Sequence, residues 1–335
     1  MHDLDKMNEH NARAEQFSAL CKDLIPPAQV SLNHPWITRY ASSAILDDNV
    51  GSDLISTADR EVYGDPAHPI AFRIGNGGAG FTGVLRSLAL DFISKHGADF
   101  RIAWVFNHSR HTQIALLADV VQVALTYEPA MEKLAEQEGW CRGVLAPVFW
   151  DHFILIGPKI NPARLAEGCG IDQAMRDIAQ SGGLFHTRGD GSATYEKEQV
   201  LWREAKVDIT SALWLEVHGS SPYSALQEAN EGGAYLLIDR ATFLTAKNDG
   251  VIPSLVVYVE GSEQLRNPCA ALVNTRVPDT PTQSLAVQFA EWLGGDAAQI
   301  NLEAYGRDWS SRLPLFTAAT NPDFPDEECL AGRAL

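Results

Sequence analysis

The sequence predicts an α/β protein with two lobes, and three observations lead to this expectation. The chain has 335 residues, enough for two lobes of ordinary size with a substantial buried core. From Pro69 onward, short apolar runs alternate with amphipathic stretches of helical length. One apolar run, VLAPVFWDHFILIG at residues 144–157, is long enough to cross from one lobe to the other. We therefore expect a sheet flanked by helices in each lobe.

The first lobe is expected at residues 66–150 and is completed by residues 254–330. Continuous apolar runs joined by helices, such as VQVAL at 121–125, are typical of a parallel sheet covered on both faces. Strands are predicted at 71–74, 100–106 and 121–127, helices at 81–95, 112–118 and 129–139, returning strands at 255–260 and 269–274, and closing helices at 282–293 and 296–305.

The second lobe is expected at residues 151–253, with helices at 172–180 and 194–204 and a strand at 235–238. Residues 1–65 differ from the rest, because prolines and many Asn, Asp and Ser residues interrupt any regular pattern after an initial helical stretch. We expect them to form an extension that wraps the first lobe.

Composition and charge exclude several classes of protein. The net charge of −17 argues against binding to nucleic acid or to an anionic membrane surface, because both need a basic face. A small anion stays compatible, since a few donors can make one pocket locally positive. No window approaches the ~20 apolar residues of a membrane span. Five scattered cysteines show no metal-ligand spacing and indicate reduced thiols.

The polar, acidic N-terminus has no apolar segment typical of a secretory signal. We therefore expect a cytoplasmic location, or a periplasmic or extracellular one if a leader has been removed. Without a leader, an ABC permease is not expected as a partner.

The stretch FRIGNGGAGF contains glycines at 75, 77 and 80, the spacing of a dinucleotide-binding loop. An NAD site needs an acid after the next strand, but that strand ends in FNHSR at residues 106–110. An NADP site using Arg110 and a tight turn without any ligand remain alternatives. We expect no cofactor, and we predict that the loop binds an anion through its backbone amides.

A series of motifs later in the chain resembles the tungstate- and molybdate-type periplasmic substrate-binding proteins of ABC importers. The motifs occur in order as WDHFILIGPKINPA (150–163), FHTRGDGSATYEKEQVLW (185–202), GGAYLLIDRATFL (232–244) and YVEGSEQLRNPCAALVN (258–274). The resemblance covers residues 70–315 and implies a type II periplasmic-binding-protein fold with a ligand cleft between the lobes. In two places this chain departs from the family: glycines replace a Thr/Ser-rich first loop, and an SGT motif has become Ser192-Ala193-Thr194.

Arg188 is the strongest candidate for an anion contact, because a guanidinium offers a planar fork of donors. It precedes the hydroxyls of Ser192 and Thr194 in a predicted loop that enters a helix. The alternatives are an ion pair between Arg188 and Asp190, and a role for Ser192 as the N-cap of that helix.

The opposite side of the site is expected to come from the glycine loop and from the end of a parallel strand. We predict that Arg188, Asn76 and Thr126 converge on one cavity. The full set of predicted ligand contacts is Asn76, Gly77, Gly78, Ala79, Thr82, Thr126, Tyr127, Arg188, Ser192 and Thr194. No metal site is expected, since His108 and His111 have no acid or Cys at useful spacing, and Asp239 and Arg240 are expected to pair with each other.

The predicted function is binding of a small anion, either an oxyanion or an organic carboxylate. In the glycine loop, backbone without side chains takes the place of the family's hydroxyl groups. This leaves room for an organic carboxylate, which is larger than an oxyanion. The alternative is a cytosolic enzyme of isomerase, cyclase or lyase type. In it, Tyr127, Glu128 and His152 would supply acid and base while Arg188 holds a substrate carboxylate. A third hypothesis, suggested by residues 1–65, is an intracellular sensor that reports anion occupancy to a protein partner.

Overall fold

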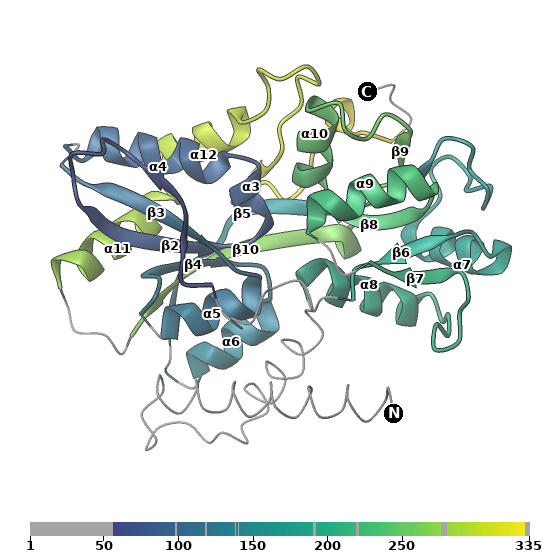
Figure 1. The fold of residues 1–335 in the computed structure, drawn as a ribbon, viewed down its shortest axis with the longest axis horizontal. Helices are drawn as coiled ribbons and strands as arrows, with labels where there is room; N and C mark the ends of the chain where they lie inside the picture. Colours follow the sequence, from purple (N-terminus) through teal and green to yellow (C-terminus); the bar gives the residue numbers. More distant parts are fainter. Residues whose placement is uncertain are drawn as a thin grey trace.

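The computed structural model describes residues 56–331, except for 98, 118, 138, 140, 190–191, 219–220 and 276–279. Two groups of strands lie side by side and share the long strand β5 (Cys141–Pro158), as Figure 1 shows. The hydrogen-bonded order is β1-β3-β2-β4-β10-β5-β8-β6-β7, with β11 (Thr317–Ala318) and β9 also paired to β5. The α/β prediction is thereby confirmed.

The first group surrounds a parallel core of three strands. Strand β2 (Ile70–Asn76) runs parallel to β3 (Arg101–Phe106) and to β4 (Val123–Thr126). Strands β1 (Asp59–Tyr63) and β10 (Arg266–Asn274) are antiparallel to their neighbours. The helices of this group are α3 (Gly78–Phe81), α4 (Val84–Lys95), α5 (Ser109–Leu117), α6 (Pro129–Gln137), α11 (Pro281–Trp292) and α12 (Asp296–Ala304).

The second group has β6 (Phe185–Thr187) parallel to both β7 (Leu215–Val217) and β8 (Tyr235–Asp239). Strand β9 (Leu255–Val259) pairs with residues 155–158 of β5, so it joins this group and not the first one as expected. The reason is that this half of β5 offers two edges, and β8 occupies the other one. The helices are α7 (Ile171–Ser181), α8 (Ala193–Glu204), α9 (Pro222–Gly232) and α10 (Arg240–Asn248).

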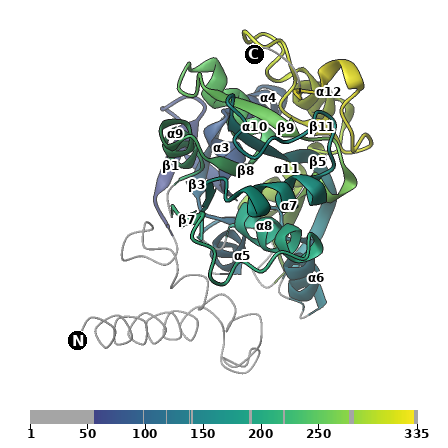
Figure 2. The same cartoon turned by 90° about the vertical axis from the view of Figure 1, so that its right-hand side faces the viewer.

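Alternation along β5 divides the second group into two packed layers. Ile154 and Ile156 lie in a core with residues of α9 and α10, whereas Phe153 and Leu155 lie in a core with residues of α7 and α8. Figure 2 shows these helix pairs on opposite faces of the strands. Both faces are therefore buried, which explains why the run at 144–157 is apolar with almost no polar interruption.

The predicted lobe limits at 150/151 and 253/254 stay a prediction, because β5 passes through both groups without a break. Residues 1–55 lie outside the described part of the chain, so the wrapping role of 1–65 also stays a prediction. Of residues 1–65, the described segment Asp59–Tyr63 forms the edge strand β1 against β3. None of the described helices combines the length and the apolar character needed to cross a bilayer.

Candidate functional site

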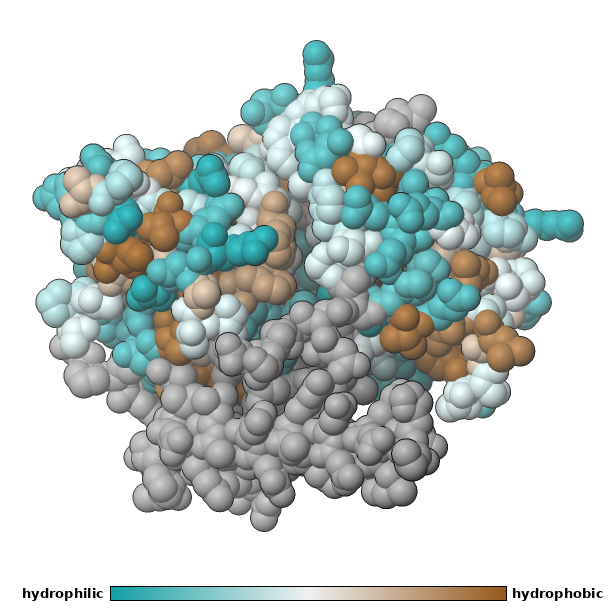
Figure 3. Space-filling view, viewed as in Figure 1, coloured by the Kyte–Doolittle hydropathy of each residue, from teal (hydrophilic) through white to brown (hydrophobic). Residues whose placement is uncertain are grey.

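A small cavity of about 50 Å³ lies where the carboxyl ends of strands from both groups meet. The surface also dips between the two groups in the space-filling view of Figure 3. The residues that line the cavity are Gly77, Gly78, Ala79, His108, Ser109, Tyr127, Asp151, Arg188, Ser192, Ala193, Thr194, Pro222, Asp239 and Asn267. This edge of the strands is where open α/β sheets bind ligands.

Five helices begin at residues that line this cavity: α3, α5, α8, α9 and α10. The first N–H groups of a helix have no partner within the helix, and the helix dipole makes that end partly positive. Several such ends directed at one small space favour a negatively charged occupant.

Arg188 follows β6 and lines the cavity with a side chain that is only 2% exposed. The residue after it, Gly189, has φ +60°, a left-handed conformation that lets the chain turn at once toward α8. The positive charge of Arg188 lies close enough to Asp239 to lower the pKa of that carboxyl, although burial has the larger, opposite effect and raises it. The alternative ion-pair partner Asp190 lies outside the described residues.

Ser192 is the N-cap of α8, since its side chain accepts a hydrogen bond from the Tyr195 backbone N. The capping alternative is therefore confirmed. Ser192 also lines the cavity together with Ala193 and Thr194. A direct contact from either hydroxyl to a ligand stays a prediction.

The glycine loop contributes Gly77, Gly78 and Ala79 to the cavity wall. The other two glycines of the dinucleotide spacing are explained by packing. A Cβ at Gly80 would lie 2.1 Å from the Trp104 ring, and a Cβ at Gly75 would lie 2.7 Å from the methyl group of Thr112. The cavity is also far too small for a dinucleotide. The Arg110 side chain lies outside what the structure describes.

Asn76, Thr82 and Thr126 do not line the cavity, contrary to the expected convergence with Arg188. Each of these side chains hydrogen-bonds a near neighbour. Asn76 Nδ2 donates to Leu125 O (3.0 Å), Thr82 Oγ1 donates to Ala79 O (2.7 Å), and Thr126 Oγ1 donates to Glu132 Oε1 (2.7 Å). Asn76 also accepts from the Gly80 backbone N, so it holds the glycine loop in place from behind.

Of the three residues proposed for acid and base catalysis, Tyr127 lines the cavity, and Glu128 and His152 do not. His152 follows Asp151 on β5, and neighbouring strand residues point to opposite faces. Its Nε2–H donates to Pro322 O at 2.7 Å, and its ring packs on Phe324. Burial lowers the pKa of His152 to about 4.

Sequence reasoning missed two carboxyl groups in the cavity wall, Asp151 and Asp239. Asp239 caps α10 by accepting from the Thr242 N at 2.7 Å, while the expected partner Arg240 pairs with Glu260 at 3.1 Å. Burial raises the pKa of Asp151 well above its ordinary value, and the nearby charge of Asp239 raises it further. Burial therefore favours the protonated form of Asp151. The position of Asp239 at the end of a strand was the available signal.

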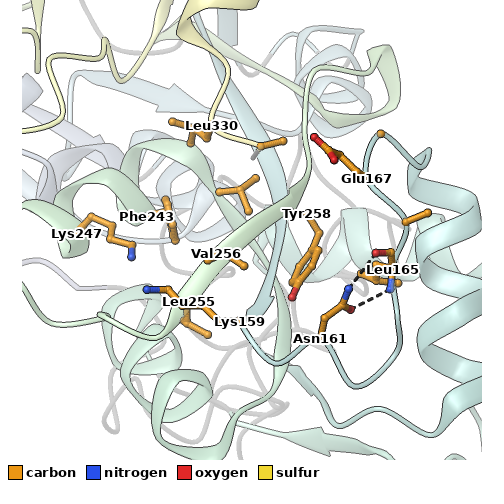
Figure 4. Close-up of a pocket in the computed structure, with 14 residues that line it drawn as sticks. Lys159, Asn161, Leu165, Glu167, Phe243, Lys247, Leu255, Val256, Tyr258 and Leu330 are labelled. Atoms are coloured by element: carbon orange, nitrogen blue, oxygen red, sulfur yellow. Dashed lines mark hydrogen bonds between the residues drawn. The ribbon is translucent and has the colours of Figure 1, made fainter. Parts of the chain in front are cut away.

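A larger groove of about 760 Å³ lies elsewhere, between β9, the segment after β5 and the C-terminal segment. Figure 4 shows Lys159 and Lys247 near apolar walls, with the Asn161 side chain bonded to the Leu165 backbone. None of the predicted site residues lines this groove. We therefore take the smaller cavity as the functional site, because charge and helix starts converge there.

Two groups of strands joined by a crossing strand, with an enclosed site at the strand ends between them, define the class of periplasmic-binding-protein-like folds. The chain belongs to the PBP superfamily: residues 66–293 match the PBP superfamily domain.

Tungstate-binding proteins are among its relatives. The tungstate-binding protein TupA of Peptoclostridium acidaminophilum is 31% identical over 173 residues, which cover 51% of this chain and 59% of that protein. TupA from Desulfovibrio alaskensis has a similar structure, with a TM-score of 0.62 and 24% identity over 76% of this chain and 100% of that one. The tungstate ABC transporter from Geobacter sulfurreducens also has a TM-score of 0.62, with 24% identity over 72% of this chain and 100% of that one.

The resemblance and the two-lobed fold predicted from the sequence are thus confirmed. The match spans less than two thirds of the curated Peptoclostridium acidaminophilum relative. These relatives give no support to the enzyme hypothesis. They also give none to the expected absence of a permease partner, since a relative from Haloferax volcanii, 31% identical over 53% of this chain and 52% of that protein, is named a putative ABC transporter anion-binding protein.

Proposed function

We propose that this protein binds a small tetrahedral oxyanion of the tungstate and molybdate type in the cavity between the two strand groups. The observation that carries the proposal is the buried Arg188 guanidinium in a cavity of about 50 Å³ at which five helices begin. Charge-assisted hydrogen bonds from Arg and from helix N-termini are the interactions that such anions require.

The size of the cavity favours an inorganic oxyanion over the organic carboxylate that the sequence left open. A tetrahedral oxyanion has five non-hydrogen atoms, whereas an organic acid needs a longer space with an apolar wall. Most of the lining residues carry polar side chains, and Tyr127 and Pro222 are the larger apolar ones. Burial raises the pKa of Asp151 and of Asp239, which reduces the repulsion that these carboxyls exert on an anion, and the charge of Arg188 lies near Asp239.

Calorimetry against tungstate, molybdate, phosphate and a panel of carboxylates tests the proposal. We expect submicromolar binding of tungstate or molybdate and far weaker binding of carboxylates. Arg188→Ala should cost about 2–4 kcal/mol of binding, a factor of roughly thirty to a thousand. Arg86→Ala is the matched control, because it removes the same charge from a surface ion pair outside the cavity.

Two outcomes would contradict this function. One is tighter binding of a carboxylate than of any oxyanion. The other is an Arg188→Ala variant that loses fold stability yet keeps its affinity for tungstate, because Arg188 would then be structural.

Location is a separate part of the proposal. The cytoplasmic location expected above, with a periplasmic or extracellular one as its alternative, stays a prediction. Cell fractionation tests it, and recovery of the protein in the periplasmic or extracellular fraction would contradict the cytoplasmic location.

A further inference from the structure

A second cluster of polar side chains lies on β6 and β7, outside the lining of the anion cavity. His186 is paired with Glu216 in the register of these two parallel strands. His218 follows Glu216 by two residues, so it lies on the same face. Its backbone N donates to Thr187 O at 2.8 Å, which keeps it beside β6. Three side chains with metal-ligand chemistry therefore share one face.

The donor atoms of these residues are close together. Glu216 Oε2 lies 3.4 Å from His218 Nε2 and 3.9 Å from His186 Nε2, and all three ligand atoms lie within 4.8 Å of one another. A tetrahedral zinc ion with bonds of about 2.0–2.2 Å holds its ligands roughly 3.4 Å apart. The rings of His186 and His218 are stacked, with their centroids 3.8 Å apart and their planes 26° apart, so one ring must rotate before both Nε2 lone pairs point at one ion.

A fourth residue orients one of the ligands. His218 Nδ1 lies 2.7 Å from Glu228 Oε2 on α9, so Nδ1–H donates to this carboxylate. Nε2 lies 3.4 Å from Glu216 Oε2, and a metal that binds Nε2 would replace any proton there. A carboxylate behind a histidine in this way is the usual support of a histidine that binds a metal.

His186 is buried, and its Nδ1 makes no hydrogen bond among the described residues. Its Nε2 lies on the side of Glu216, at 3.9 Å from Oε2, and is therefore the nitrogen that faces the cluster. Gly232 on α9 lies against this ring, because a Cβ there would lie 3.3 Å from Cε1 and 3.5 Å from Nε2.

We propose that His186, Glu216 and His218 bind a divalent transition metal of the Zn²⁺ type, with Glu228 orienting His218. Two imidazoles and one carboxylate suit zinc and leave a fourth position for water. The exposed sides of Glu216 and His218 provide the entry path. The sequence suggested no metal site, since His186 and His218 are 32 positions apart and only the pairing of β6 with β7 brings them together.

Titration of the chelator-treated, full-length protein with ZnCl₂ tests this site. We expect about one zinc ion bound per chain. Glu216→Gln and His218→Ala should each weaken binding at least tenfold, and Glu228→Gln should weaken it 10- to 100-fold, as loss of an orienting carboxylate does. Glu231→Gln is the matched control, because it removes a second carboxylate from the same helix without touching the cluster. Circular dichroism checks that each variant folds.

Cobalt provides a readout that identifies the ligands. Tetrahedral Co²⁺ bound by nitrogen and oxygen should give visible absorption without a thiolate charge-transfer band. Such a band would place the metal on a cysteine and overturn the proposal. Unchanged zinc affinity in both Glu216→Gln and His218→Ala, or no zinc binding by the intact protein, would overturn it as well. Arg188→Ala should keep the zinc affinity, so this test and the test of oxyanion binding fail independently.

Discussion

Single side chains decide the charge of the cavity. Asp151 and Asp239 face the same small space as Arg188, and two ionised carboxylates there would oppose an anion. Burial and the charge of Asp239 raise the pKa of Asp151. Burial also raises the pKa of Asp239, and the charge of Arg188 partly opposes that effect. Both effects of burial reduce the negative charge that an anion meets in the cavity, and the helix starts add positive potential.

Asp151→Asn should flatten the dependence of stability on pH. The pKa of Asp151 is raised in the folded state, so this residue contributes to the free energy of unfolding at low pH. That contribution is fully present below the ordinary value of 3.8 and is lost as pH rises through the folded pKa. Asn keeps the neutral shape and still accepts from the His152 N, a bond of 2.7 Å in the wild type. Urea unfolding at a series of pH values measures the effect. If the free energy of unfolding changed with pH equally in both proteins above pH 3.8, Asp151 would have an ordinary pKa in the folded state.

The glycine at 80 is required by contact with one aromatic ring. Gly80→Ala should cost about 1–3 kcal/mol, because the new methyl group would overlap the Trp104 ring. Trp104→Phe removes the overlapping atoms. The loss of stability in the double variant should therefore be smaller than the sum of the losses in the two single variants, by more than about 0.5 kcal/mol. Denaturant unfolding of all four proteins gives this coupling. Additive costs would show that the ring does not exclude a side chain at position 80.

At the scale of elements, the site is made by helix starts and not by helix faces. Strands β2, β3, β4, β6 and β8 end at the cavity, and a helix follows each of the five directly or after a short loop. The same short connections place Ser192 and Asp239 as N-caps, and each of these side chains satisfies one backbone N–H at the start of its helix.

Ser192→Ala and Ser221→Ala form a matched pair. Both serines cap a helix through a bond from the third residue of that helix, Tyr195 N at 3.3 Å or Ser224 N at 3.2 Å. Each variant should lose about 1 kcal/mol of stability. Only Ser192 lines the cavity, so only Ser192→Ala should also weaken tungstate binding. Equal affinities of the two variants for tungstate, measured by calorimetry, would limit Ser192 to capping.

At the scale of the molecule, the cavity is shared between two groups of strands that β5 and β10 connect. The wall at Gly77–Ala79 comes from the first group, and the wall of Arg188 and Ser192–Thr194 comes from the second. A ligand that contacts both walls binds only when they are held together, so it must stabilise the closed arrangement.

Tungstate should therefore raise the melting temperature of the intact protein. At a free concentration 100 times the dissociation constant, the ligand adds about 2.7 kcal/mol to the free energy of unfolding, which is a rise of roughly 5 °C for a protein of this size. Arg188→Ala should keep at most about a third of this rise at the same concentration, because its affinity is at least about thirtyfold weaker. An equal rise with sodium chloride at matched ionic strength would show a general salt effect.

The sequence by itself was enough to predict most of the order of strands and helices, although it did not predict β1, β6, β7, α9 and α10. It was also enough to predict the relation to tungstate-binding proteins and the presence of Arg188, Ser192 and the Gly77–Ala79 backbone at the cavity. These features depend on local periodicity and on motifs that are continuous in the chain, which is why they can be read without coordinates.

Only the tertiary structure decided which polar groups face the ligand space. The Asn76, Thr82 and Thr126 side chains bond to neighbouring groups, and no pattern of residue types reveals such partners. Side chains alternate between the two faces of β5, so Asp151 lines the cavity while His152 contacts Pro322 on the other face. Which face is which depends on the register of β5 against β10. The cluster of His186, Glu216 and His218 likewise exists because β6 pairs with β7, and pairing between distant segments is decided by packing of the whole molecule.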